Sequence, residues 1–181
     1  EDALSNVNNS SIKSYVDNWY KNNLNNYTDK ISEKAYFCND RRITSGDGYG
    51  MSITNYQPLD RVKNGKIDLN CPQIQDKFTV SNETGNGDLT YPIGLITSDE
   101  AMMAGGIYGS ANILYYLYSG YNYWTMSAHT LNTWFYTRNQ VITETGVISS
   151  GDNLYAQGVR PVINLDPDKI TFTGNGTMQD P

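Results

Sequence analysis

Two segments decide the fold: Tyr121-Asn122-Tyr123-Trp124-Thr125-Met126-Ser127 and Gly158-Val159-Arg160-Pro161-Val162-Ile163-Asn164-Leu165. In both, aromatic or apolar residues alternate with polar ones, which is typical of half-buried strands. Between them, the apolar pairs Val141-Ile142 and Val147-Ile148 flank Glu144-Thr145-Gly146. A glycine between two apolar pairs favours a hairpin turn. We therefore predict an antiparallel β-meander over residues 121–165.

The pattern also assigns parts of the meander. Trp124 and Met126 are expected on one face of the first strand, and residues 133–137 form a second strand. Residues 150–153 are predicted as a turn because they include Gly151, Asp152 and Asn153. Residues 159–165 are predicted as the last core strand, in which Pro161 leaves one position without an N–H donor.

Two helices are predicted upstream. Apolar residues at helical spacing from Ile12 predict an amphipathic helix that Ser10 or Ser11 caps and that runs to about Asn26. The second helix begins with the capping box Thr97-Ser98-Asp99-Glu100 and ends at Gly105-Gly106. We interpret the acidic pair in that box as capping residues rather than as catalytic carboxylates.

Three regions lie between these helices. Residues 43–57 are rich in glycine and predicted to be irregular, residues 58–88 are predicted as a long surface excursion, and residues 89–96 approach an edge strand. Cys38 and Cys71 are the only cysteines. They could form a disulfide or remain buried thiols, and the low charge favours the disulfide and an extracellular or cell-surface location.

The composition bounds the class of function. The chain of 181 residues fits a single domain over residues 10–181 after a polar lead-in at residues 1–9. It has 15 Tyr and 21 Asn, only 18% charged residues and a net charge of −6. No Lys/Arg cluster could neutralise phosphates, so we expect no nucleic-acid partner. No apolar run is long enough for this segment to insert directly into a membrane.

Tyr, Asn, Ser and Gly are the residues of recognition surfaces, although extracellular β-proteins are also rich in them.

No motif specifies a catalytic site. Ser127 and His129 lie two residues apart, but no Gly-x-Ser-x-Gly elbow accompanies them, and we place the histidine in a turn. No cofactor is predicted. Asp47 could ligate calcium, but no Asp-x-Asp-x-Asp loop supports such a site.

Arg160 lies in an apolar strand and is expected to be a core arginine paired with Asp40, Asp99 or Glu100.

Several blocks together resemble a known family. They are Trp19-Tyr20, Phe37–Arg41, Tyr91–Glu100, Tyr123–Ser127 and Gly158–Val162. The chain is similar to bacterial uncharacterised domains of the C-type-lectin-like fold, in the formylglycine-generating-enzyme-like (sulfatase-modifying-factor-like) branch. The match covers most of residues 11–177. It departs from the family at Ala128, where such domains commonly have proline.

The resemblance implies an α+β fold: a twisted antiparallel sheet with two flanking helices and long loops. Such domains usually begin with strands before the first helix, and their absence here implies residues upstream of Glu1. The oxidase chemistry of the branch uses a cysteine pair in the C-terminal half, and no cysteine follows Cys71. The calcium-dependent sugar motifs of C-type lectins are absent as well.

These arguments predict a non-catalytic extracellular binding or adhesion module. It would recognise a protein or glycan ligand on an aromatic, Asn-rich face. The expected ligand-binding residues are Tyr121, Trp134, Tyr136, Arg138, Asn153 and Tyr155. One alternative is the head of a pilin-like or other self-assembling surface subunit, whose partners are copies of itself. The other, disfavoured, is an enzyme on the same fold.

Overall fold

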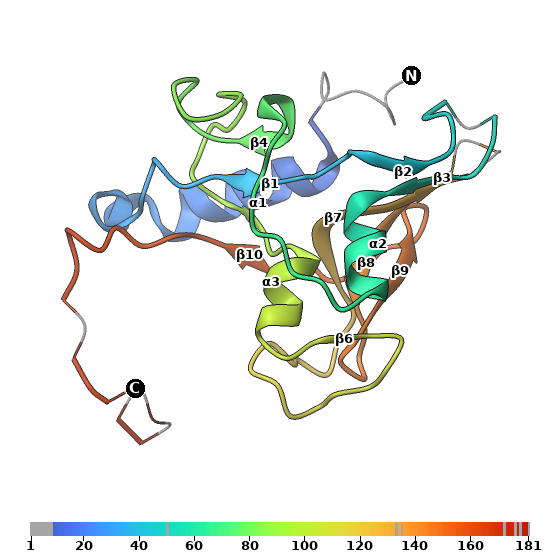
Figure 1. Cartoon of the computed structure of the whole chain (residues 1–181). Helices are drawn as coiled ribbons and strands as arrows, with labels where there is room; N and C mark the ends of the chain where they lie inside the picture. The colour runs from blue at the N-terminus through green and yellow to red at the C-terminus, as the bar shows by residue number, and fades with distance from the viewer. Residues whose placement is uncertain are drawn as a thin grey trace.

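The centre of the molecule is a six-stranded sheet of order β2-β3-β7-β8-β9-β6 (Figure 1). The computed structural model describes residues 9–49, 51–132, 134, 136–171, 173–175, 177 and 179–180. The predicted meander supplies the middle strands β7 (Tyr123–Leu131), β8 (Thr137–Ile142) and β9 (Val147–Asp152), which pair antiparallel. One edge strand is β6 (Ile107–Tyr108). On the other side β3 (Thr54–Tyr56) follows β7, and β2 (Ile43–Ser45) is the second edge strand. Among the strand pairs of the described residues, β6 with β9 is parallel and the others are antiparallel, so the fold has the predicted α+β character.

Helices cover both faces of this sheet. Neighbouring residues on a strand point to opposite faces, and on β7 Trp124 and Tyr123 are buried in two separate apolar clusters. The Trp124 cluster includes Val16 and Tyr20 of α1 (Ser11–Asn23), and Met126 packs against it as predicted. The Tyr123 cluster includes residues of α2 (Gln57–Lys63) and α3 (Ser98–Met103). Within the described residues, no helix has the length and apolar character to cross a bilayer.

Both predicted helix starts are confirmed. The Ser10 hydroxyl accepts a hydrogen bond from the Lys13 N–H at 3.1 Å. This helix ends earlier than predicted, at Asn23, and a 3-10 helix follows over Asn25–Lys30. At α3 the capping box is reciprocal, because Thr97 accepts from the Glu100 N–H and Glu100 accepts from the Thr97 N–H.

The region between α1 and α3 has more regular structure than predicted. Residues 43–57 contain the β2–β3 hairpin, so their assignment as irregular is wrong. Residues 58–88 contain most of α2, a 3-10 helix over Ile74–Asp76 and strand β4 (Lys77–Phe78). The helix is too short to show a periodicity, although Pro58 in its first turn is a start signal.

The disulfide between Cys38 and Cys71 is present, with a Cα–Cα distance of 5.7 Å. Cys38 belongs to β1 (Phe37–Cys38), which pairs antiparallel with β4. Cys71 lies in the segment after α2, and the Tyr36 hydroxyl also holds that segment by donating to the Leu69 carbonyl at 3.0 Å. The bond therefore fastens residues 64–72 to the small β1–β4 sheet.

Three boundaries inside the meander differ from the prediction. The turn predicted over residues 150–153 begins only at Asn153, because β9 continues through Asp152. Thr133 and Phe135 lie outside the described residues, whereas Trp134 and Tyr136 lie in the turn before β8. Both of their N–H groups donate to the Asn132 side-chain oxygen at 3.0 Å, which replaces strand pairing there.

The last predicted strand is also shorter than expected. Of residues 159–165, only Pro161–Val162 form a strand, β10. It pairs with β5 (Gly94–Leu95) in a separate two-stranded sheet and not with the meander. A proline at the first strand position has no N–H to donate, which limits how far pairing can extend.

Candidate functional site

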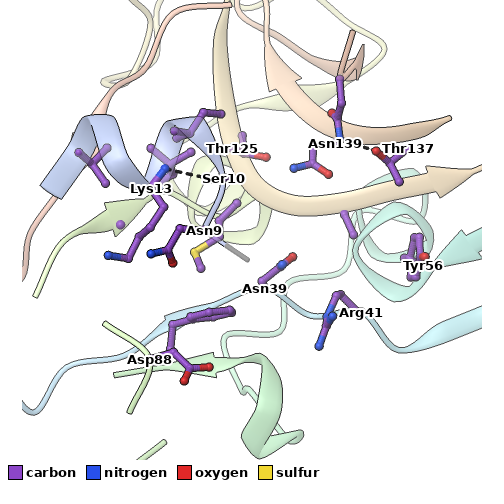
Figure 2. A pocket seen from close by; sticks show the side chains of 18 of the residues that line it. Asn9, Ser10, Lys13, Asn39, Arg41, Tyr56, Asp88, Thr125, Thr137 and Asn139 are labelled. Atoms are coloured by element: carbon purple, nitrogen blue, oxygen red, sulfur yellow. Dashed lines mark hydrogen bonds between the residues drawn. The ribbon is translucent and has the colours of Figure 1, made fainter. Parts of the chain in front are cut away.

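A cleft of about 350 Å³ lies between the start of α1, the β7–β8 face of the sheet and the β1–β4 sheet (Figure 2). This volume is within the range of small-molecule sites. Its apolar lining includes Ile12, Val16, Leu89, Ile93, Leu95 and Met126. Its polar lining consists mainly of amide and hydroxyl side chains: Asn9, Ser10, Asn39, Thr125, Thr130, Thr137, Asn139 and Asn153.

Two of these amides are free to bind a ligand. Asn39 follows β1, and its backbone N–H donates to the Asp76 carbonyl at 2.9 Å. Asn139 lies on β8, and Figure 2 shows the two side chains reaching the cleft from different walls. Both residues are half-buried. Over the described part of the chain, no hydrogen bond engages either side-chain amide.

The other polar groups on the sheet side are fixed by internal bonds. The Thr125 hydroxyl is buried and donates to the Gln140 carbonyl at 2.8 Å. The Asn153 amide donates to the Thr137 hydroxyl at 2.7 Å. Burial raises the pKa of Tyr56, so its phenol stays protonated. These contacts hold the side chains at the rim of the cleft in one arrangement. Because they are ordered before a ligand arrives, less conformational entropy is lost on binding.

Two of the cationic side chains at the cleft are already neutralised. Lys13 forms an ion pair with Asp17 one turn along α1. The Arg41 guanidinium binds Asp76 through Nε at 2.8 Å and through a terminal nitrogen at 2.7 Å. The cleft therefore offers an uncharged ligand several hydrogen bonds and an apolar floor, without a strong local charge from these two residues.

The structure brings together only part of the predicted ligand-binding set. Arg138 and Asn153 both line the cleft. Tyr121, Trp134, Tyr136 and Tyr155 are exposed but do not line it. Trp134 and Tyr136 share the β7–β8 turn, whereas Tyr121 precedes the opposite end of β7. A role in ligand binding stays a prediction for all six.

Sequence reasoning missed Asn39 and Asn139. The excess of asparagine indicated that amides would matter, yet nothing local separates these two from the other asparagines. Asn39 belongs to a block that carries the family resemblance, which drew attention to its cysteine and charged neighbours instead. Their shared position depends on long-range packing of β1 and α1 against the sheet.

A second cavity of about 360 Å³ adjoins a buried network of charges. Arg61 of α2 donates through Nε and a terminal nitrogen to Asp99, at 2.7 and 2.8 Å, and to Asp40 at 2.6 Å. Burial acts to lower the pKa of Arg61, but the bonds to both carboxylates outweigh it and raise the pKa, so the charge is retained. Asp40 also accepts from Arg42.

This network corrects two predictions. The core arginine is Arg61, and Arg160 instead donates to the Leu117 carbonyl at 2.7 Å and lies over the Tyr123 ring. The two acidic residues of the capping box also have separate roles. Glu100 caps α3, whereas Asp99 is 2% exposed and binds Arg61.

The residues weighed for catalysis lie elsewhere. His129 lies within β7 and not in a turn, is buried, and does not line the cleft. Burial, with the charges of Lys63 and Arg138, lowers its pKa to about 4. Ser127 accepts a hydrogen bond from the Ser98 N–H at 2.9 Å.

The predicted calcium candidate makes a local contact. The Asp47 carboxylate accepts a hydrogen bond from the Tyr49 N–H at 2.8 Å. Among the residues whose positions are described, no group of three His, Cys, Asp or Glu side chains is placed to hold a metal ion.

Comparisons with protein-family models, with curated proteins and with solved structures found no match to this chain.

Proposed function

We propose that the chain is a non-catalytic binding module that recognises a neutral glycan in the cleft between α1 and the sheet. The observation that carries this proposal is the pair of half-buried, unengaged amides of Asn39 and Asn139 above an apolar floor. An amide presents two donors and one acceptor oxygen. A sugar ring combines hydroxyl groups with an apolar C–H face, so it can use both parts of this lining.

Neutral rather than charged ligands are favoured because Lys13 and Arg41 already have carboxylate partners, and the other two charged lining residues, Asp88 and Arg138, are of opposite sign. A ligand carboxylate would have to compete with Asp17 or Asp76 for these cations. A neutral ligand needs only to displace water from the amides and the apolar floor.

We further propose that the module acts outside the cell or on its surface, and that its architecture is of the C-type-lectin-like kind. The disulfide supports the location, since such bonds persist mainly in oxidising compartments. The sequence blocks that resemble the formylglycine-generating-enzyme-like branch support the architecture, together with a central sheet flanked by helices.

A glycan panel tests the proposal. The wild-type chain and the variants Asn39→Ala, Asn139→Ala and Asn26→Ala are applied to neutral and acidic oligosaccharides. Asn26 is an exposed amide outside the cleft, so its replacement is the matched control. We expect the two cleft variants to lose at least tenfold in affinity, about 1.4 kcal/mol, for a neutral glycan that the control still binds.

If a glycan binds and neither cleft variant weakens that binding, the cleft is not the binding site. In that case the variants Trp134→Ala and Tyr136→Ala test the exposed β7–β8 turn, which holds two of the six ligand-binding residues predicted from the sequence. Loss of binding in those variants would move the site to the turn.

A further inference from the structure

The longest uncharged stretch of the chain forms a separate surface. No Asp, Glu, Lys or Arg occurs between Glu100 and Arg138, although the whole chain carries a net charge of −6. The loop from β6 to β7 lies at one end of the molecule, below α3 in the view of Figure 1. It presents Leu114 at 92% exposure and Tyr116 at 89%. Apolar side chains this exposed, in a group, are characteristic of interaction sites.

Contacts behind the exposed side chains hold this loop in place. Tyr115, between Leu114 and Tyr116, is only 7% exposed and belongs to the buried cluster beneath α2 and α3. The Asn112 side chain donates to the Gly105 carbonyl at 2.8 Å and accepts from the Leu114 N–H at 3.0 Å. A loop ordered before binding loses less entropy when a partner arrives.

Two charged residues, Arg160 and Glu144, hydrogen-bond to the β6–β7 connection at its back and rim. The Leu117 carbonyl accepts from the Tyr123 hydroxyl at 2.9 Å and from the half-buried Arg160 guanidinium at 2.7 Å. At the rim, the Glu144 N–H donates to the Asn122 side chain at 2.7 Å. The outward side of the loop therefore carries no charge of its own.

We propose that this surface, formed by exposed side chains of residues 103–121, is where two copies of the chain associate as a symmetric dimer. Two copies that each carry −6 repel one another over most approaches. An uncharged face lets them meet without placing like charges in contact. A two-fold interface uses the same patch on both copies, so the dimer leaves no second patch for further copies to bind.

The available area reaches the lower end of what such a contact needs. A tyrosine buries roughly 150–250 Å², and an aliphatic side chain worth about 1.5–3 kcal/mol at about 25 cal/mol per Å² buries roughly 60–120 Å². With their exposed fractions, the six exposed apolar residues of the segment offer on the order of 600 Å², and a stable interface buries roughly 600–1,000 Å² per partner. These residues are Met103, Ile107, Ile113, Leu114, Tyr116 and Tyr121.

Sedimentation velocity over about 1–100 μM, a range that brackets micromolar affinity, tests the proposal on the full chain. We expect the mass to rise with concentration from 20.3 kDa towards twice that value. The double variant Leu114→Ser/Tyr116→Ser should raise the dissociation constant by more than about tenfold. The control Tyr15→Ser/Tyr27→Ser removes two similarly apolar, exposed side chains from the other end of the sequence and should dimerise like the wild type.

Salt provides a second readout. Because no charge lies on the proposed contact, raising the ionic strength from about 0.05 to 0.5 M should preserve or strengthen the dimer by screening the net repulsion. A wild type that is monomeric throughout, a double variant that dimerises normally, or a dimer that salt dissociates would each overturn the proposal. None of these results depends on whether the cleft binds a glycan.

Discussion

Replacing Arg61 with methionine should produce one of the largest losses of stability available in this chain. The substitution removes three hydrogen bonds of 2.6–2.8 Å and, among the described residues, the one guanidinium that contacts Asp99. Asp40 would keep its bonds to Arg42. Of its partners in the described part of the chain, Asp99 would keep only the Asp68 N–H at 3.0 Å while 2% exposed, so it would become an uncompensated buried charge.

Breaking a buried pair from one side costs about 3–5 kcal/mol. For a chain of this size that corresponds to a fall in Tm of roughly 6–20 °C. Urea unfolding at pH 7, with the disulfide intact, measures the change. The control is the double variant Arg61→Met/Asp99→Asn, which removes the orphaned charge and keeps a carbonyl acceptor for the Asp68 N–H.

We expect the double variant to recover more than half of the loss, because the two effects are coupled. A single variant that loses less than about 1 kcal/mol would refute the reasoning. A double variant less stable than the single one would also refute it, since the unpaired Asp99 charge could not then be the main cost.

Three further predictions concern other parts of the fold. The pKa of His129 is lowered to about 4 in the folded chain, so between pH 6.5 and about 4 its side chain binds a proton only in the unfolded chain, and the free energy of unfolding should fall by up to about 3 kcal/mol as the pH drops. In urea unfolding, His129→Gln should reduce the dependence of this free energy on pH over that range, and an unchanged slope would contradict the prediction. Cys38→Ser/Cys71→Ser should cost roughly 3–4 kcal/mol of unfolding free energy, and a calorimetric Tm within about 3 °C of wild type would disprove it. Gly146→Ala should lower the free energy of unfolding by at least about 1 kcal/mol, because φ of this residue is +76° and the added Cβ would lie 2.0 Å from the Asn112 carbonyl oxygen. A Tm equal to that of the wild type would exclude this strain.

The sequence predicted the elements whose signals are local. The capping box at Thr97, the cap at Ser10 and the hairpin glycine Gly146 each depend on a few neighbouring residues, and all three are present. The first half of β7 was also predicted, from the alternation up to Ser127, but its continuation through His129 was not, because that residue was placed in a turn. The disulfide was favoured from composition alone.

What could not be predicted depends on contacts between distant segments. Arg61 and Asp99 are separated by 38 positions and meet only when α2 packs beside α3. The same holds for the cleft, where Asn39 follows β1 of the two-stranded sheet and Asn139 lies on β8 of the six-stranded sheet. Trp134 illustrates the opposite error, since a run of aromatics resembles a strand but Asn132 folds it into a turn.

Binding of a neutral glycan in the cleft through Asn39 and Asn139 is tested most directly by the side-chain amide NMR signals of the wild-type chain during titration with neutral oligosaccharides. We expect saturable shifts of the signals that Asn39→Ala and Asn139→Ala delete, while the Asn26 signal stays in place. Saturable binding that moves neither cleft amide and shifts only the Trp134 indole or other distant signals would contradict it.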